Sequence, residues 1–162
     1  MVYIRTKKIS NNNYAYLVEI INTKKGPRQK VIQYLGRVYD LELKKDIINQ
    51  KNNQNNKNEI ILSLVLPELL ARGFNHKNDK WSFQKLTFNS KELTLTKTIK
   101  NKKSKEAIIS LNDGYLCTFT LQRIINFKRT KDLQKDAQSL AKYFLEAGLN
   151  ISQEQFISFY QK

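Results

Sequence analysis

The chain has 162 residues, 40% of them hydrophobic, which is enough apolar material for one folded domain or for two small ones. This composition excludes a chain that is disordered throughout. Lysine and arginine number 29 against 14 aspartates and glutamates, and the resulting net charge of +15 favours a polyanionic partner such as nucleic acid.

The first 38 residues predict three short strands in an antiparallel meander. Residues 2–9, 14–22 and 28–35 are rich in β-branched and aromatic side chains, which is typical of strands. The asparagines at 11–13 and the sequence TKKGP at 23–27 are typical of the turns between them. The sequence therefore predicts a basic β segment at 1–38.

A linker is predicted over residues 39–58. Its first part, residues 40–50, has a partial helical stripe and is compatible with a short helix. The polar run KNNQNNKN at 51–58 has the low complexity of a linker or loop. These residues separate the β segment from an α+β region at 59–162, unless the two pack as one domain.

The first half of that region predicts a helix and a hairpin. A mostly buried helix is predicted over 59–72, with Pro67 as the point where it kinks or restarts. Residues 81–88 and 92–99 predict the two strands of a hairpin. Residues 106–111 are apolar and fit either a strand or a helix.

The C-terminal part predicts helices. Thr120 has the side chain of a cap and is expected to open a helix through Phe127, and the clearest helical periodicity covers residues 131–147. Ser152 and Gln155 have the spacing of a capping box, which predicts a last helix over 153–160. The predicted fold class is therefore α+β, with an N-terminal three-stranded antiparallel sheet, a central helix and β-hairpin, and C-terminal helices.

No catalytic or metal site is predicted. The only histidine, His76, lies in a polar stretch typical of a loop and has no partners for a metal cluster or a nucleophile–base pair. The only cysteine, Cys117, lies in the apolar run YLCTF and is expected to be a buried, inert thiol. Phosphate-binding glycine motifs do not occur in the sequence. We therefore expect no enzymatic activity and no cofactor.

The compartment is inferred from three features. A single cysteine forms no internal disulfide, which is typical of a reducing environment. The longest apolar stretch, residues 60–70, is interrupted and far shorter than the roughly 20 residues of a membrane-spanning helix. The N-terminus has no apolar signal region. We expect a cytoplasmic protein with no membrane partner, associated with the nucleoid if it binds DNA.

Positive charge is concentrated in the first 38 residues, where eight basic side chains accompany one acid, Glu19. Alternation along a strand places side chains that are two residues apart on the same face. Within each strand, one face is therefore predicted to carry a set of these side chains: Tyr3, Arg5 and Lys7 in the first strand, Tyr14 and Tyr16 with Val18 and Ile20 in the second, and Arg28, Lys30 and Tyr34 with Ile32 in the third.

If the strand register joins these faces, cations that neutralise phosphates lie beside rings that stack on bases. The alternative is that the tyrosines are core residues and the charges face solvent. The nucleic-acid contacts predicted in this segment are Arg5, Lys7, Lys8, Tyr14, Tyr16, Lys24, Lys25, Arg28, Lys30, Tyr34 and Arg37.

A second basic region covers residues 77–105, where nine lysines accompany two acids. Lysine suits phosphate contact without base reading. The phosphate contacts predicted here are Lys100, Lys102, Lys103 and Lys105. A solvated hairpin edge that its lysines protect from aggregation explains the same pattern equally well.

The C-terminal helix pair has the outline of a helix-turn-helix, but its last segment, QEQFISFY, has no basic side chain with which to contact DNA. Its apolar residues, Phe156, Ile157, Phe159 and Tyr160, are expected to pack in the core. The alternative is that they form an interface with a protein partner or with a second copy of the chain.

Four features of the basic β segment match a known pattern. They are a basic first strand, the aromatic second strand YAYLVE at 14–19, a basic turn at 24–28 and a third strand ending in YLG at 34–36. Over about the first 38 residues, this pattern resembles the β-rich segment at the start of DDE-type insertion-sequence transposases and of related small archaeal proteins. The resemblance implies DNA binding by this segment. Transposition is not expected, because the chain is too short to hold the catalytic domain as well.

The leading hypothesis is a non-enzymatic protein that binds double-stranded DNA with little sequence specificity, in a chromatin-like or regulatory role. The alternatives are RNA binding, including association with the ribosome, and a protein–protein interaction module. Tyrosines exposed on the sheet would favour single strands or RNA, whereas tyrosines buried beneath a basic surface would favour phosphate contacts along a duplex.

Overall fold

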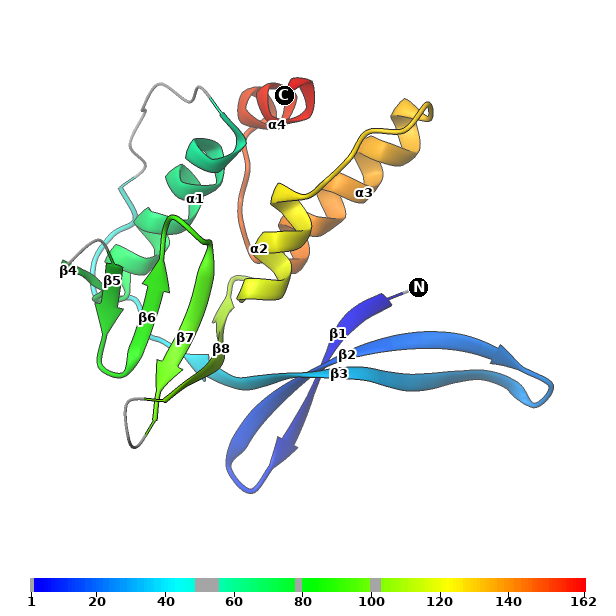
Figure 1. Ribbon diagram of the computed structural model, residues 1–162, viewed down its shortest axis with the longest axis horizontal. Coiled ribbons are helices and arrows are strands. Elements are labelled where there is room, and N and C mark those ends of the chain that lie inside the picture. Colours follow the sequence, from blue (N-terminus) through cyan, green and yellow to red (C-terminus); the bar gives the residue numbers. More distant parts are fainter. Residues whose placement is uncertain (1, 49–55, 78–79, 100–102) are drawn as a thin grey trace.

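The computed structural model describes residues 2–48, 56–77, 80–99 and 103–162. It confirms an α+β fold, in which the strands form one sheet and the helices gather on one side of the molecule (Figure 1). The elements in chain order are β1 (Val2–Ile9), β2 (Asn12–Thr23), β3 (Gly26–Asp40), α1 (Lys57–Ala71), β4 (Asn75–Lys77), β5 (Lys80–Phe83), β6 (Leu86–Asn89), β7 (Thr94–Thr98), β8 (Ser104–Leu111), β9 (Gly114–Leu116), α2 (Thr118–Ile125), α3 (Leu133–Glu146) and α4 (Gln153–Gln161).

The sheet contains strands from both predicted regions, the β segment at 1–38 and the α+β region at 59–162. Its strand order is β1-β2-β3-β8-β7-β6-β5-β4, and β9 pairs with β8. The predicted N-terminal meander is present as β1, β2 and β3, but it is not a separate sheet. The last residues of β3, from Arg37 to Asp40, run parallel to Ala107–Ser110 of β8. Pairing with β8 covers an edge of the meander that would otherwise be open, and it places residue 38 inside a strand.

Two hydrophobic clusters lie on opposite faces of β8. Ile109 belongs to the main core, which includes buried side chains of the four helices and of β6 and β7. Its neighbour Ile108 belongs to a smaller cluster with Ala15, Leu17 and Val38 of the N-terminal strands. Because successive side chains of a strand point to opposite faces, β8 is the strand that connects the two cores.

The structure confirms most of the predicted helices. The helix expected over 59–72 is α1, which continues through Pro67 without a break. The capping box of α4 forms as expected: Ser152 Oγ accepts from Gln155 N at 3.2 Å, and Gln155 Oε1 accepts from Ser152 N at 3.3 Å. The start of α2 differs from the predicted one, because the N-cap is Cys117 and not Thr120. The Thr120 hydroxyl instead accepts a hydrogen bond from the backbone N–H of Cys117 at 3.1 Å.

The short helix that the sequence of residues 40–50 allows as an alternative to a linker does not form in its described part. Residues 41–48 have no helical turn, and residues 49 and 50 lie outside the described residues. The backbone N–H groups of Lys44 and Lys45 instead donate to Ala71 O, at 2.8 and 3.2 Å. Ala71 ends α1, so this segment supplies donors to a helix end that lacks intrahelical partners.

The first strand of the predicted hairpin also differs from the prediction. The segment 81–88 is not one strand but two, β5 and β6, because the chain turns back at Gln84, whose φ is +53°. The parity of the apolar residues changes at that point, from Trp81 and Phe83 to Leu86 and Phe88. The apolar residues 106–111 form a strand within β8. His76 was expected in a loop, but it lies in the short strand β4, with its ring 4.9 Å from that of Trp81.

Candidate nucleic-acid interface

The register of β1 and β2 brings the predicted basic and aromatic side chains together. Arg5 lies opposite Tyr16, and Lys7 lies opposite Tyr14. Residues that face each other across an antiparallel pair point to the same side of the sheet. The prediction that these four side chains share one face is therefore confirmed.

The third strand follows this pattern only in part. Two β-bulges interrupt its pairing with β2, so that Leu35 and Ile32 have no direct partner. Each bulge adds a residue and shifts the alternation of the strand. Tyr34 lies opposite Tyr16 and therefore belongs to the face of Arg5, which the alternation predicted.

Arg28 and Lys30 do not share the face of Tyr34, and the prediction that they do is wrong. Arg28 lies opposite Ile21, and Lys30 lies opposite Glu19. Glu19 in turn faces Val2, on the side of the sheet that carries the smaller core. The bulge at Ile32 causes the difference, because the alternation from Lys30 to Tyr34 contains one extra residue.

The same face continues across the strands that β3 joins. Arg37 lies opposite Tyr14 on one side and beside Ala107 of β8 on the other. Two residues before Ala107, Lys105 lies opposite Lys97 of β7. Five cations therefore occupy one face of five neighbouring strands. We call this surface the basic face and define it by Arg5, Lys7, Arg37, Lys97 and Lys105, together with Tyr3, Tyr14, Tyr16, Tyr34 and Tyr39.

The acids of these strands lie on the opposite side. Within β1, β2, β3, β7 and β8, which are described in full, the acidic residues are Glu19, Asp40 and Glu106. Glu19 faces Val2, Asp40 lies beside Ser110, and Glu106 faces Thr96, all of which belong to the other face. The alternation of these strands thus separates their acids from the five cations.

Three tyrosines form a cluster in the middle of the basic face. The ring centroid of Tyr34 lies 5.4 Å from that of Tyr16 and 6.4 Å from that of Tyr14. Tyr34 is 53% exposed, whereas the other two are half-buried. Partial burial, and then the neighbouring tyrosines, raise the pKa of Tyr34 above its ordinary value.

A groove of about 420 Å³ crosses the basic face where β3 meets β8 and β7. Tyr39 lies at its centre: the Lys97 ammonium donates to the Tyr39 hydroxyl at 2.6 Å and stands 4.6 Å from the ring centroid. The Arg37 guanidinium lies 5.2 Å from the same centroid. The groove is lined by Tyr34, Leu35, Gly36, Arg37, Tyr39, Lys97, Ile99, Lys105 and Glu106.

Sequence reasoning did not name Lys97 or Tyr39 as site residues. Lys97 belongs to the second basic region but lies on a strand far from β3 in the sequence. Tyr39 lies two residues after Arg37, so alternation alone places both on the same face. The alternation was not applied to Tyr39 because the third strand was expected to end at residue 35.

The other predicted contact residues lie apart from the basic face. Lys24 and Lys25 form the tip of the β2–β3 hairpin, and Lys8 faces Asn13 near the β1–β2 turn. Lys103 is exposed just before β8. Lys100 and Lys102 lie outside the described residues.

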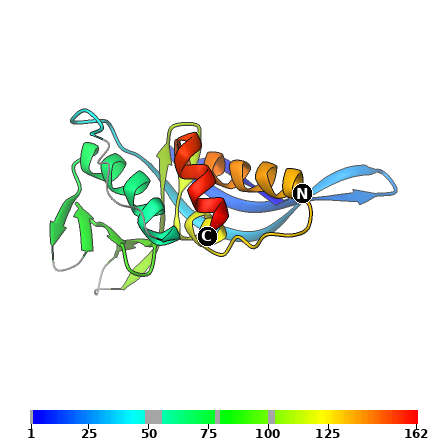
Figure 2. The same ribbon diagram turned by 90° about the horizontal axis from the view of Figure 1, so that it is seen from above.

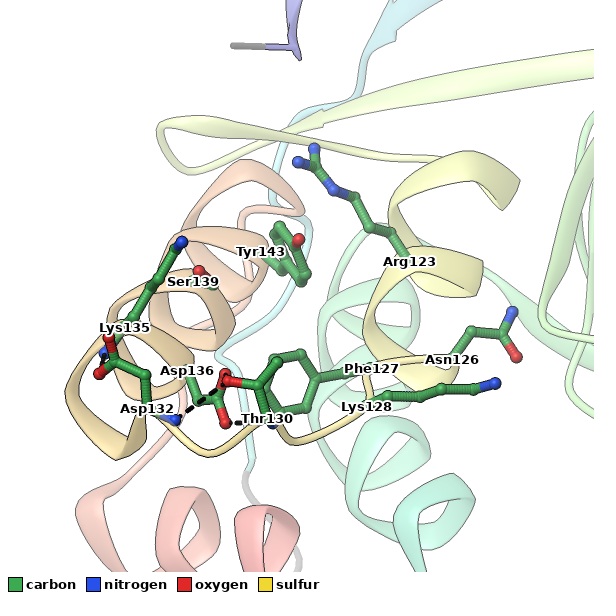
Figure 3. A pocket seen from close by; sticks show the side chains of 10 residues that line it. All are labelled: Arg123, Asn126, Phe127, Lys128, Thr130, Asp132, Lys135, Asp136, Ser139 and Tyr143. Atoms are coloured by element: carbon green, nitrogen blue, oxygen red, sulfur yellow. Dashed lines mark hydrogen bonds between the residues drawn. The ribbon is translucent and has the colours of Figure 1, made fainter.

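A second cavity, of about 590 Å³, lies between α2 and α3 (Figure 3). Its charged groups mostly have partners within the chain. The Asp136 carboxylate accepts from Thr130 N at 2.6 Å and from Thr130 Oγ1 at 2.8 Å, and these bonds lower its pKa. The Arg123 guanidinium contacts Glu146 at 2.6 Å and lies 4.1 Å from the Tyr143 ring centroid. These contacts connect the helices and the loop between them.

The remaining predicted functional groups are placed as follows. Cys117 is buried at 3% exposure, as expected, and burial raises the pKa of its thiol. Phe159 packs in the main core, whereas Ile157 is 47% exposed. In the part of the chain that the structure describes, no three His, Cys, Asp or Glu side chains converge as metal ligands would. Nor does any described helix have the length and apolar character needed to cross a membrane.

Comparison with known proteins adds no relative to this picture. No protein-family model, no curated protein and no solved structure matches the chain. The resemblance of residues 2–38 to transposase segments stays a prediction that rests on those residues alone.

Proposed function

We propose that this protein binds nucleic acid with little sequence specificity, that duplex DNA is its preferred ligand, and that the basic face is the contact surface. The observation that supports the proposal most strongly is the separation of charge across the sheet. Five cations share one face of five adjacent strands, and the acids of those strands lie on the other. A polyanion that follows this face meets the five cations and the tyrosines between them, with Glu106 as the acid of these strands that lines the groove.

The chemistry of the face fits a phosphate backbone. Arginine and lysine neutralise phosphates and release condensed counterions, and this release supplies most of the affinity of non-specific binding. Contacts to phosphates position a duplex without reading its sequence. The resemblance of the N-terminal segment to DNA-binding segments of transposases supports DNA as the preferred polyanion.

The dependence of affinity on salt tests the proposal. The association constant for a labelled short duplex, measured by fluorescence anisotropy at several salt concentrations, gives a log–log slope. Five phosphate contacts predict a slope of about −4.5. The triple variant Arg5→Ala, Lys7→Ala, Arg37→Ala should reduce its magnitude by about 2.7, at about 0.9 for each contact.

A matched control removes the same charge elsewhere. Lys128, Lys131 and Lys135 are exposed cations of the α2–α3 connection and the start of α3, outside the basic face. Their triple alanine variant should leave the slope close to that of the unaltered protein. If both triple variants reduce the slope equally, net charge explains the binding and the basic face does not. An absence of binding at low salt contradicts the proposal altogether.

A second candidate is single-stranded nucleic acid, including RNA. It is favoured by one observation, the 53% exposure of the Tyr34 ring in the middle of the basic face. Stacking of a base on an aromatic ring contributes about 1–3 kcal/mol by alanine substitution. Under this candidate, Tyr34→Ala weakens binding to a single strand by that amount and leaves duplex binding unchanged. Tighter binding of the single strand than of the duplex, in the same titration, makes it the leading function.

A further inference from the structure

The hairpin of β2 and β3 extends beyond the rest of the sheet as a two-stranded arm. The first described residue of β1, Val2, pairs with Glu19, and from there β2 and β3 continue as a pair to Thr23 and Gly26. Figures 1 and 2 both show this pair projecting away from the helices and the other strands. We call residues 20–32, which comprise this pair and the residues of β3 at its base, the arm.

The arm has a defined direction because its base is held in two ways. The bulge at Ile32 lies next to the base of the arm, and bulges bend a strand and increase its twist. A chain of hydrogen bonds also crosses its base: Arg5 donates to the Gln29 side-chain oxygen, and the Gln29 amide nitrogen donates to the Tyr3 hydroxyl. These bonds therefore connect the arm to Arg5, which is one of the five cations of the basic face.

The composition of the arm is unusual for a solvent-exposed ribbon. Residues 20–32 contain four cations and no acid. They also carry four exposed apolar side chains: Ile20 and Ile21 are each 37% exposed, Val31 is 59% exposed and Ile32 is 48% exposed. The apolar residues occupy both faces, since Ile21 lies opposite Arg28 whereas Ile20 lies opposite Gln29. A partner that surrounds the ribbon on both faces and carries negative charge explains both features.

We propose that this arm inserts into the major groove of duplex DNA, which deepens the proposed function and rests on it. A two-stranded ribbon fits the major groove, which is about 12 Å wide, but not the minor groove, which is about 6 Å wide. Four residue pairs extend beyond Glu19, and at about 3.3 Å for each residue they cover about 13 Å. Laid along the groove, this ribbon turns the side chains of one of its faces toward the base edges.

The chemistry of the groove matches the two kinds of side chain. The thymine C5-methyl group is an apolar surface in the major groove, and Ile20 and Ile21, one on each face of the projecting pairs, are suited to contact it. Lys24, Lys25 and Arg28 then lie near the phosphates that line the groove. A second copy of the arm is a poorer partner, because pairing two arms places four cations against four cations.

The test compares a duplex that contains thymine with the same duplex in which deoxyuridine replaces thymine. This replacement removes only methyl groups and keeps every phosphate and base pair. The unaltered protein should bind the thymine duplex more tightly, by about fourfold for each methyl group buried. The variant Ile20→Thr, Ile21→Thr keeps β-branched side chains in the ribbon and should abolish that difference while leaving the salt slope unchanged.

Further outcomes distinguish this inference from the proposed function. The triple variant of the basic face should lower the salt slope but still prefer thymine. Equal binding of the two duplexes by the unaltered protein, with a normal salt slope, overturns the arm inference and leaves the function standing. A dimer that the arm variant dissociates, seen by sedimentation equilibrium, also overturns it, because the arm then binds a second copy. No binding of either duplex at low salt contradicts the function itself.

Discussion

Gly36 of β3 lies so close to Glu106 of β8 that a Cβ atom on the glycine would stand 2.8 Å from the Glu106 carbonyl oxygen. Its φ of +137° is also one that side-chain-bearing residues rarely adopt. This contact lies next to the parallel pairing of β3 with β8, which joins the N-terminal meander to the rest of the sheet. Glycine at this position therefore permits the basic face to continue from Arg37 to Lys105.

The first prediction concerns that glycine. Gly36→Ala should lower the free energy of unfolding, measured by urea denaturation, by more than Gly26→Ala does. Both glycines have positive φ, and the backbone strain of such a conformation costs about 1–3 kcal/mol. Gly26 has no atom within 4 Å of an added Cβ, so its variant measures strain alone. Equal losses in the two variants would mean that the approach to Glu106 contributes nothing.

The second prediction separates charge from hydrogen bonding in the groove. Lys97→Met removes a cation of the basic face and should reduce the salt slope of duplex binding by about 0.9, the value of one phosphate contact. Tyr39→Phe removes the hydroxyl that the Lys97 ammonium contacts but keeps the ring beneath it. The slope of Tyr39→Phe should therefore equal that of the unaltered protein. A smaller slope in Tyr39→Phe would show that the hydroxyl itself contributes to binding.

The third prediction concerns acid stability. Hydrogen bonds from Thr130 lower the pKa of Asp136 in the folded protein below the usual aspartate value of about 3.9. The stabilisation is therefore complete above the unfolded pKa and is lost as the pH falls through the folded one. Asp136→Asn should lower the urea midpoint at neutral pH and weaken its decline below about pH 4.

A graded variant checks the cause of that pH dependence. Thr130→Val removes the hydroxyl that donates to the carboxylate but keeps the backbone N–H that also donates to it. Its pH dependence should lie between those of the unaltered protein and of Asp136→Asn. A full pH dependence in Asp136→Asn would assign the acid sensitivity to another carboxylate.

The fourth prediction tests how the arm is held. Gln29→Leu removes both hydrogen bonds at the base of the arm, those with Arg5 and with the Tyr3 hydroxyl. Amide hydrogen exchange of residues 20–31 should become faster, while exchange of the core strands stays unchanged. The change in global stability should be small, about 0.5–1.5 kcal/mol for each hydrogen bond at most. Unchanged exchange in the arm would show that the bulge alone holds it.

Much of the secondary structure was predictable because it depends on local pattern. The strand propensity of residues 2–9, the periodicity of 131–147 and the capping box of Ser152 and Gln155 each depend on neighbours in sequence, and each element formed. The failed helix at 41–48 shows the limit of such patterns. There the amides of Lys44 and Lys45 bond to the end of α1, a partner that the local sequence does not contain.

By itself, the sequence determined that the protein is α+β, where its positive charge is concentrated, and that Arg5 shares a face of its strand with Lys7, as Tyr14 does with Tyr16. These properties follow from composition and from alternation within single strands. Only the tertiary structure decided that β3 pairs with β8 and that Arg28 and Lys30 point away from Tyr34. The physical reason is that a bulge and a long-range strand pairing depend on packing between distant segments, and each bulge reverses the alternation from which the faces were predicted.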